Sequence, residues 1–373
     1  MNLLRIPSGE SAPVEHRRVL MTVDAVGGVW RYAMELARGL LAHNIGVVFA
    51  GLGPQPSSYQ AEEAKRLGKV VWLDEPLDWI APDETAVKGL PAKLARLARQ
   101  QHADLLHLNL PSQAAGMDTE LPVVVASHSC VVTWWHAMRN EPLPADWEWM
   151  KRQNAVGMDQ AHAVVSPSGS HAQAISACYG EQPRLTVVHN AISAFLQGVE
   201  KEPFVFSAAR WWDEGKNGRV LDEAAARMHW PVVMAGSTRG PNGQEITFSR
   251  VRCPGEIPHR EVLDSIRRAG IVVSPSLYEP FGLAALEGAR AGAALVLSDI
   301  PTYRELWSNA AIFFDPKDAD ALAHAVSRLA SDSGLRAEMG AKALARSRRF
   351  TPDVQASRMA ELYRQLVDEP MAA

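Results

Sequence analysis

The sequence contains few of the features that would assign a class of protein at once. Only three of its 373 residues are cysteines, and Cys130, Cys178 and Cys253 have neither the spacing of a metal site nor the even number of a disulfide framework. We therefore expect buried thiols in a reducing compartment. No apolar run approaches the roughly 18 residues that a membrane-spanning helix needs, and the first residues lack the apolar core of a signal peptide. These absences predict a cytoplasmic protein and leave peripheral contact with the inner face of a membrane open.

An excess of positive charge is also missing. The 38 Lys and Arg residues oppose 42 Asp and Glu, for a net charge of −4, so no basic surface for nucleic acid is indicated. The loop that contains Gly27 and Gly28 lacks the complete Gly-x-Gly-x-x-Gly pattern, which disfavours a dinucleotide-binding dehydrogenase. No Asp-x-Asp motif stands out either, and we expect no bound metal.

What the sequence does have is an alternation of short apolar runs and helical stretches. With 47% hydrophobic and 21% charged residues, the chain is long enough for two or three globular domains. Such alternation is typical of βαβ units around a parallel sheet. The strands expected in the first half lie at residues 18–23, 46–50, 70–73, 105–108, 123–126, 163–166 and 185–188.

The same pattern starts again in the second half, after a linker expected at residues 193–203. Its expected strands lie at residues 204–208, 231–235, 271–273, 294–297 and 311–314. Residues 1–15 form a polar leader that we expect to be disordered, and the Thr351-Pro-Asp sequence is typical of a helix start. The pattern therefore divides the chain into a Rossmann-like domain at 1–195, a second Rossmann-like domain at 203–350 and a final helix at 351–373.

One stretch of the second half carries two carboxylates between a strand and a helix. Residues 271–273 form the continuous apolar run of a buried parallel strand. Gly282 allows close approach of the backbone, and residues 283–291, rich in Ala and Leu, predict a helix. Free N–H groups at such a helix start can bind an anion. Glu279 lies in the turn and Glu287 about one turn into the helix, so the two carboxylates can face different parts of one ligand.

The sequence Glu279-Pro-Phe-Gly followed by Glu287 resembles the paired-glutamate signature of retaining glycosyltransferases with the GT-B fold, in particular family 4. The resemblance implies an α/β protein of two Rossmann-like domains that face each other across a cleft, with a C-terminal helix that crosses back to the N-terminal domain. It also implies that Glu287 binds the ribose of a nucleotide sugar and that Glu279 binds hydroxyls of the transferred sugar. The donor's diphosphate would lie on the turn formed by Pro280, Phe281, Gly282 and Leu283.

A charged loop follows the first strand of the second half. The residues from Arg210 to Lys216 resemble the family's Gly-Arg…Lys-Gly loop, in which both cations hold the donor's diphosphate. The resemblance implies that the two cations stabilise the negative charge of the leaving diphosphate. A solvated loop of mixed charge is the alternative. The loop departs from the family pattern at Ala209, Trp212 and Asn217.

The ends of two expected strands in the first half complete the predicted site. Gly27 and Gly28 lie where the resemblance implies backbone N–H groups close to the diphosphate and the acceptor. His128 follows residues 123–126, at the edge where ligands of parallel sheets bind. Its position fits a structural or a catalytic histidine equally, and the resemblance implies contact with the donor sugar. Together with Glu279, Arg210 and Lys216, His128 is predicted to be catalytic.

Tryptophan is concentrated between residues 131 and 150. Tryptophan faces stack on sugar rings and on apolar parts of lipids. We therefore predict that Trp134 and Trp135 contribute to the acceptor site, together with Asn109 at the tip of another expected strand. Packing between loops is the alternative explanation for most of these tryptophans.

The residues and the resemblance together predict a retaining, metal-independent glycosyltransferase. It would move a sugar from a UDP- or GDP-linked donor to an acceptor hydroxyl in the synthesis of a glycan, polysaccharide or glycolipid, without a separate cofactor. The acceptor is expected to be a glycan, a lipid-linked molecule or a small molecule. Two alternatives stay open: a GT-B epimerase of nucleotide sugars, and a subunit that binds a nucleotide sugar without turnover. Neither the donor and acceptor identities nor the oligomeric state can be read from the sequence.

Overall fold

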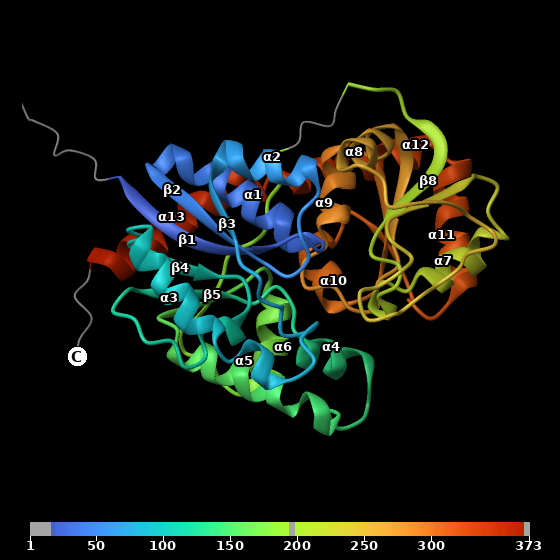
Figure 1. The fold of residues 1–373 in the computed structure, drawn as a ribbon. Coiled ribbons are helices and arrows are strands. Elements are labelled where there is room, and N and C mark those ends of the chain that lie inside the picture. The colour runs from blue at the N-terminus through green and yellow to red at the C-terminus, as the bar shows by residue number, and fades with distance from the viewer. Residues whose placement is uncertain (1–15, 194–197, 369–373) are drawn as a thin grey trace, which may run out of the picture.

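The computed structural model describes residues 16–193 and 198–368. This part of the chain forms two lobes, each built on a parallel sheet with a buried hydrophobic cluster on either face (Figure 1). The alternation of strands and helices predicted from the sequence is confirmed in both lobes. The expected leader at 1–15, residues 194–197 of the expected linker and residues 369–373 of the expected final helix lie outside the described residues.

The first sheet has seven strands in the order β3-β2-β1-β4-β5-β6-β7, and every neighbouring pair is parallel. Its strands are β1 (Arg17–Asp24), β2 (Ile45–Leu52), β3 (Gly68–Trp72), β4 (Leu105–Leu108), β5 (Val123–Ala126), β6 (Ala163–Ser166) and β7 (Leu185–Val187). The helices of this lobe are α1 (Gly28–Leu40), α2 (Ser58–Leu67), α3 (Leu90–Gln100), α4 (Val131–Met138), α5 (Glu148–Gln160) and α6 (Gly169–Tyr179).

The second sheet has six parallel strands in the order β10-β9-β8-β11-β12-β13. Its strands are β8 (Glu202–Ala208), β9 (Val232–Ala235), β10 (Arg252–Gly255), β11 (Ala269–Ser274), β12 (Ala294–Ser298) and β13 (Ile312–Phe314). The helices that follow are α7 (Gly218–Ala225), α8 (His259–Arg268), α9 (Leu283–Arg290), α10 (Pro301–Trp307), α11 (Ala319–Ser331), α12 (Ser333–Ser347) and α13 (Pro352–Asp368).

Strand β10 is the one element of the second sheet that the sequence did not predict. It pairs only with β9 and lies at the sheet edge, where its residues are exposed or half-buried. An edge strand needs no apolar run, and this one contains a proline, which edge strands tolerate. The central strands were predicted because they are buried on both faces. All four residues of β5 and all six of β11, for example, are buried.

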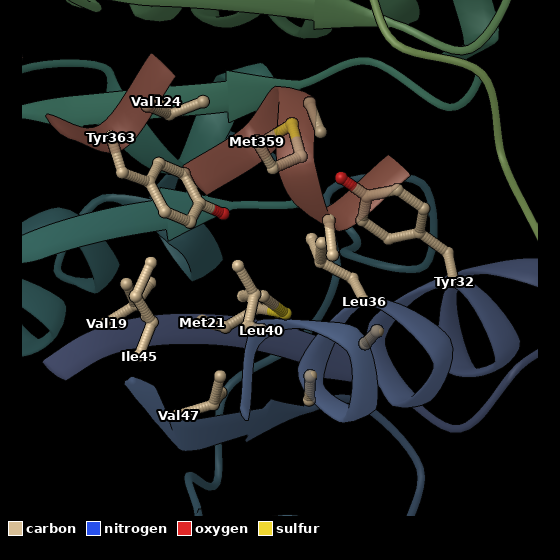
Figure 2. Close-up of a cluster of buried hydrophobic side chains, with 14 of the residues drawn as sticks. Val19, Met21, Tyr32, Leu36, Leu40, Ile45, Val47, Val124, Met359 and Tyr363 are labelled. Carbon is tan, nitrogen blue, oxygen red and sulfur yellow. The ribbon is translucent and has the colours of Figure 1, made fainter. Parts of the chain in front are cut away.

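Helix α13 leaves the second lobe and packs on the first, which confirms the predicted crossing back. In Figure 1 it lies with β1 and β2, whereas α11 and α12 lie in the other lobe. Figure 2 shows Met359 and Tyr363 of α13 over the side chains of Leu36 and Leu40 from α1. Both α13 side chains are almost completely buried. Burial of each contributes on the order of 1.5–3 kcal/mol, so the last helix ties the two lobes together.

Candidate active site

A cavity of about 730 Å³ lies between the two lobes, large enough for a nucleotide sugar. In each sheet the strand order reverses at one point, between β1 and β4 in the first sheet and between β8 and β11 in the second. Both of these points face the cavity. Ligands of open parallel sheets bind outside the carboxyl ends of the strands at such points. Asp24, at the end of β1, and Arg210, just after β8, both line the cavity.

The turn after β11 presents the start of α9 to this cavity. The residue before the helix, Gly282, has a φ of 90°, and no side chain caps the helix N-terminus. The first N–H groups of a helix have no partner within the helix, so this end can bind an anion. Phe281 is buried in the core of the second lobe and anchors the turn. Pro280, Phe281, Gly282 and Leu283 all line the cavity, in the arrangement that the sequence predicted.

Glu279 and Lys216 meet beside this helix start. The Nζ of Lys216 lies 2.6 Å from Oε2 of Glu279, and the two side chains are 14% and 16% exposed. The charge of each is therefore compensated by the other. Ser276 Oγ also donates to Glu279 Oε2, at 3.4 Å. The loop of Lys216 and the turn of Glu279, 63 residues apart in the chain, come together as predicted.

Arg210 reaches across the cavity to the glycine loop of the first lobe. Its Nη1 donates to the carbonyl oxygen of Val26 at 3.3 Å, and its guanidinium lies over the ring of Trp212 at 5.4 Å. Gly27 has a φ of 96°, and a Cβ built on it would lie 2.9 Å from Arg210 Nη1. A larger residue at position 27 would be disfavoured by the positive φ and would require the Arg210 side chain to move. Gly28 begins α1 and also lines the cavity.

Glu287 lies inside α9 and pairs with a histidine that sequence reasoning missed. His259 Nε2 is 3.1 Å from Glu287 Oε1, and the Glu287 side chain is only 8% exposed. One carboxylate oxygen is thus fixed by the imidazole, and the other is available to a ligand. His259 is the first residue of α8 and follows the unpredicted strand β10, so no motif in the sequence signalled it.

Asp24 was missed as well, although it ends the apolar run of β1. It accepts a hydrogen bond from the Val26 N–H at 2.8 Å. Burial raises the pKa of Asp24 to about 6, against the opposing effects of this hydrogen bond and of the Arg210 charge. The strand-end rule that selected His128 would have selected Asp24 as well.

His128 lines the cavity at the end of β5, as predicted. Burial, together with the nearby His107 and His171, lowers the pKa of His128 to about 3, so the imidazole is neutral at ordinary pH. The ring of Tyr32 contacts it edge-on, with 4.2 Å between ring centroids. Tyr32 in turn lies 3.3 Å from His107 Nε2, and the hydroxyl of Tyr363 from α13 lies 2.7 Å from His107 Nδ1. Helix α13 therefore supports the position of His128 through Tyr363, His107 and Tyr32.

Two of the residues predicted to bind the acceptor do not reach the cavity. Asn109 is 2% exposed and directs its side chain to His128 and Thr22 instead. Trp135 donates from Nε1 to the carbonyl oxygen of Glu141 at 3.0 Å and packs edge-on against Trp147. For Trp135 the alternative of packing between loops is the correct one, because its polar nitrogen is already satisfied by the backbone.

Trp134 does line the cavity, but it also links the two lobes. Its Nε1 donates to Oδ1 of Asp213 at 3.1 Å, beside an ion pair between Arg139 and Glu214. Two further tryptophans of the wall were not predicted: Trp79 from the first lobe and Trp212 from the second lie nearly parallel, with centroids 6.5 Å apart. This pair could not be predicted from the sequence, because the two residues are far apart in the chain.

The lobes also meet through polar contacts next to the Glu279 turn. The carboxylate of Glu305 on α10 accepts hydrogen bonds from the N–H groups of Gly169 and Ser170 at 2.9 and 2.7 Å, so it caps α6 of the other lobe. Ser168 Oγ donates to the carbonyl oxygen of Pro280 at 2.6 Å, and Tyr278 Oη donates to Thr133 Oγ1 at 2.9 Å. The turn that carries the predicted site is therefore held by both lobes.

Within residues 16–193 and 198–368, no group of three or more His, Cys, Asp or Glu side chains is arranged to hold a metal ion. No helix within them is both long and apolar enough to cross a membrane.

Two protein-family models match adjoining parts of the chain. The first, described as Glycosyltransferase Family 4, matches residues 26–194, and the second, described as Glycosyl transferases group 1, matches residues 192–346. Together they cover both lobes and the cavity between them. The chain belongs to glycosyltransferase family 4.

Curated relatives of this family 4 glycosyltransferase match only in part. It is 26% identical to the D-inositol 3-phosphate glycosyltransferase of Xylanimonas cellulosilytica over 79% of this chain and 70% of the relative. It is 27% identical to O-antigen chain mannosyltransferase B of Escherichia coli over 40% of this chain and 34% of that protein. A glycogen synthase of Mycobacterium tuberculosis is 42% identical over 22% of this chain and 20% of the relative. The latter two alignments thus span about a third and a fifth of those proteins.

Solved structures confirm the GT-B fold of this family 4 glycosyltransferase over almost its whole length. The sucrose-phosphate synthase of Thermosynechococcus elongatus has a TM-score of 0.77 at 17% identity, with 94% of this chain and 99% of that chain covered. HepE of Anabaena, crystallised with UDP-glucose, has a TM-score of 0.74 at 17% identity, with 94% and 100% covered. The predicted α/β architecture of two Rossmann-like domains is therefore correct.

Proposed function

We propose that this chain is a retaining glycosyltransferase that moves a sugar from a nucleotide diphosphate sugar to an acceptor hydroxyl. The observation that carries the proposal is the convergence of three groups on one part of the cavity: the Lys216–Glu279 pair, Arg210 and the uncapped N-terminus of α9. Two cations and a helix N-terminus favour a doubly charged anion such as a diphosphate. A carboxylate placed beside them suits the hydroxyls of an attached sugar.

This arrangement would lower the barrier to breaking the sugar–phosphate bond. As the bond breaks, negative charge grows on the departing diphosphate. Arg210, Lys216 and the α9 N–H groups lie where they can stabilise it. Glu279 would release Lys216 in part and accept hydrogen bonds from the sugar, which aligns its anomeric carbon. The acceptor hydroxyl would attack from the face that the diphosphate leaves, and a phosphate oxygen would take its proton.

The nucleotide would lie beside Glu287, about one turn into α9. Glu287, with one oxygen held by His259, would accept hydrogen bonds from the ribose diol through its second oxygen. Both UDP and GDP fit this proposal. The UDP-glucose bound by HepE makes UDP-glucose the first donor to test. Sugar transfer is the activity named for the curated relatives, among them a mannosyltransferase and an inositol phosphate glycosyltransferase, so glycans and small polyols are the first acceptors to test.

The test begins with donor binding and ends with the stereochemistry of transfer. UDP, GDP, UDP-glucose and GDP-mannose are screened by thermal shift, and the stabilising donor is incubated with a panel of glycan and polyol acceptors. Proton NMR of the product should show the anomeric configuration of the donor retained. Inversion of configuration would contradict the retaining mechanism, and an altered sugar nucleotide formed without acceptor would indicate an epimerase. Binding of a donor without turnover under any condition would indicate a binding subunit.

Transfer is proposed to be independent of a divalent metal, because two cationic side chains already face the diphosphate position. Turnover should therefore be the same in EDTA as in Mg²⁺ or Mn²⁺, measured as nucleotide diphosphate released. Complete loss of turnover in EDTA with recovery on addition of either metal would contradict this part of the proposal.

A further inference from the structure

Asn109 is buried at the end of β4, and its hydrogen bonds fix the orientation of its side-chain amide. Its backbone N–H donates to Thr22 Oγ1 at 2.7 Å, and its Nδ2 donates to the carbonyl oxygen of Thr22 at 2.5 Å. A backbone carbonyl can only accept, so Nδ2 must be on that side and Oδ1 must be the atom that faces His128. Thr22 Oγ1 in turn donates a hydrogen bond to Oε1 of the buried Gln113 at 2.7 Å.

This orientation determines which nitrogen of His128 carries the proton. The distance from His128 Nε2 to Asn109 Oδ1 is 2.8 Å. Because an amide oxygen has no proton to give, Nε2 must be the donor, and in a neutral ring Nδ1 is then the acceptor. Nδ1 has no hydrogen-bond partner among the described residues, and it is not among their polar atoms that are both unpaired and shielded from solvent. Since His128 lines the cavity, this lone pair is open to a ligand.

The surroundings of His128 favour the neutral form that this arrangement needs. The titratable groups that bear on it are His107 on β4, His171 on α6 and Tyr32 on α1. Burial and the two histidines all act against a charged imidazole. The edge-on ring of Tyr32 limits rotation of the imidazole, since the two centroids are 4.2 Å apart. Tautomer, charge and ring plane are therefore fixed before a ligand arrives.

We propose that Asn109 is a positioning residue that holds His128 in the Nε2–H tautomer, so that Nδ1 accepts a hydrogen bond from a hydroxyl of the bound sugar. The choice of a sugar as ligand rests on the proposed function, whereas the tautomer rests on the Asn109 contacts alone. This role replaces the acceptor contact predicted for Asn109 from the sequence. It also explains why a polar side chain is buried at a strand end without reaching the cavity.

The tautomer is tested directly by nitrogen NMR on the full chain labelled with [¹⁵N]histidine. The chain has 12 histidines, and the His128 signals are identified as those lost in His128→Gln. In the unsubstituted protein Nε2 should be protonated and Nδ1 unprotonated from pH 6 to 9. Asn109→Ala should give a mixture of tautomers. Asn109→Asp keeps an acceptor for Nε2, so it should keep the tautomer, and its charge should raise the pKa of His128 by about 1 to 3 units. It also replaces the donor to the Thr22 carbonyl by an acceptor, so its folding is checked as well.

Turnover with UDP-glucose and GDP-mannose supplies the functional arm. Asn109→Ala should lower kcat/KM about tenfold, the equivalent of one hydrogen bond, while Asn109→Asp should recover activity at high pH and lose it as pH falls through the raised pKa. Asn154→Ala is the matched control, because Asn154 is buried and hydrogen-bonded but lies on α5. Thermal melts identify any unfolded variant, and the nitrogen NMR of the unsubstituted protein decides the tautomer if both variants unfold.

The two arms separate failure of this inference from failure of the proposed function. A protonated Nδ1 in the unsubstituted protein, or an Asn109→Ala spectrum that does not change, would overturn the inference whatever the activity. Equal kcat/KM for Asn109→Ala and Asn154→Ala would overturn it in an active enzyme. If neither donor is turned over, the proposed function fails for these donors and the NMR result still decides the tautomer.

Discussion

At the scale of single residues, the site is built from charges that compensate one another. Lys216 pairs with Glu279, and Asp24 lies in the field of Arg210. Compensation lets charged groups stay partly buried without a large cost. A ligand that carries both a diphosphate and hydroxyls can bind both members of the Lys216–Glu279 pair. The diphosphate would contact Lys216, and the hydroxyls would contact Glu279.

Lys216→Ala should reduce donor turnover about 10² to 10³-fold, as expected when one preorganised group that stabilises developing charge is lost. It also leaves the half-buried Glu279 without its partner, so donor KM should rise as well. Lys342→Ala is the matched control, because Lys342 lies on α12 in an exposed ion pair with Glu338. Steady-state kinetics with the donor found in the binding screen is the measurement. Similar kcat/KM in the two variants would remove Lys216 from the catalytic set.

Asp24→Asn should change how stability depends on pH. The folded-state pKa of Asp24, about 6, lies above the ordinary 3.8, so the folded form binds the proton more tightly. Its contribution is present below pH 3.8 and lost as pH rises through 6, by roughly 3 kcal/mol at most. The variant should therefore gain Tm relative to the unsubstituted protein between pH 4 and 7. The comparison is made by thermal melts at each pH, since the histidines with lowered pKa act in the opposite direction in both proteins.

The control for this prediction is Asp74→Asn, at an exposed position in the same lobe. It should leave the pH dependence of Tm unchanged. A Tm difference between Asp24→Asn and the unsubstituted protein that stays constant from pH 4 to 7 would show that Asp24 does not titrate in this range.

At the scale of elements, helix α9 is the part on which the site depends most. Its N-terminus faces the cavity, its first turns carry Glu287, and its buried face packs against β11 and β12. A small shift of this helix would move the proposed diphosphate and ribose contacts together. Gly282 sets where the helix begins, because its positive φ turns the chain directly from the Glu279 turn into the first helical residue.

Gly282→Ala should destabilise the protein and abolish nucleotide binding. The backbone conformation alone costs an alanine about 1–2 kcal/mol. In addition, the new Cβ would lie 2.7 Å from Cε1 of the buried Tyr303. Gly292→Ala at the other end of α9 is the matched control: its φ is +71° and nothing lies within 4 Å of a Cβ there. Thermal melts and nucleotide titrations should show the larger Tm loss, and the loss of binding, only in Gly282→Ala.

At the scale of the whole molecule, the two lobes are held together by α13 and by contacts beside the site. The Glu305 carboxylate caps helix α6 of the other lobe, and Ser168 from the same helix start holds Pro280. Opening the lobes would therefore break contacts to the very turn that carries Glu279. Closure of the lobes and order in the site are coupled through these few hydrogen bonds.

Glu305→Ala should weaken donor binding without preventing folding. The contact is comparable to a helix cap, worth roughly 0.5–2 kcal/mol, so Kd for the donor should rise up to about 30-fold. Solution scattering should show a larger radius of gyration in the absence of ligand. Glu338→Ala, on the exposed face of α12, provides the control. Unchanged scattering and Kd in Glu305→Ala would show that the cap does not hold the lobes closed.

Much of the architecture could be predicted because local sequence dictates it. Strands such as β4, β5 and β6 are buried on both faces, so their apolar runs gave their bounds correctly. The β10 edge strand has no such run and was missed. In the same way, the Glu279 turn and the Arg210 loop carry contiguous motifs, and the structure brings them to one cavity. The roles assigned to their residues stay predictions.

What the sequence determined by itself is the class of fold, the family and the residues of the two contiguous motifs, because these depend on local periodicity and short spacing. Only the tertiary structure decided which residues from distant segments meet. It joined Glu287 to His259, placed Trp79 beside Trp212, and directed Asn109 to His128 rather than to the cavity. The physical reason is that a hydrogen bond or a stacked ring depends on how elements distant in the sequence pack together, and no local pattern in the sequence encodes that packing.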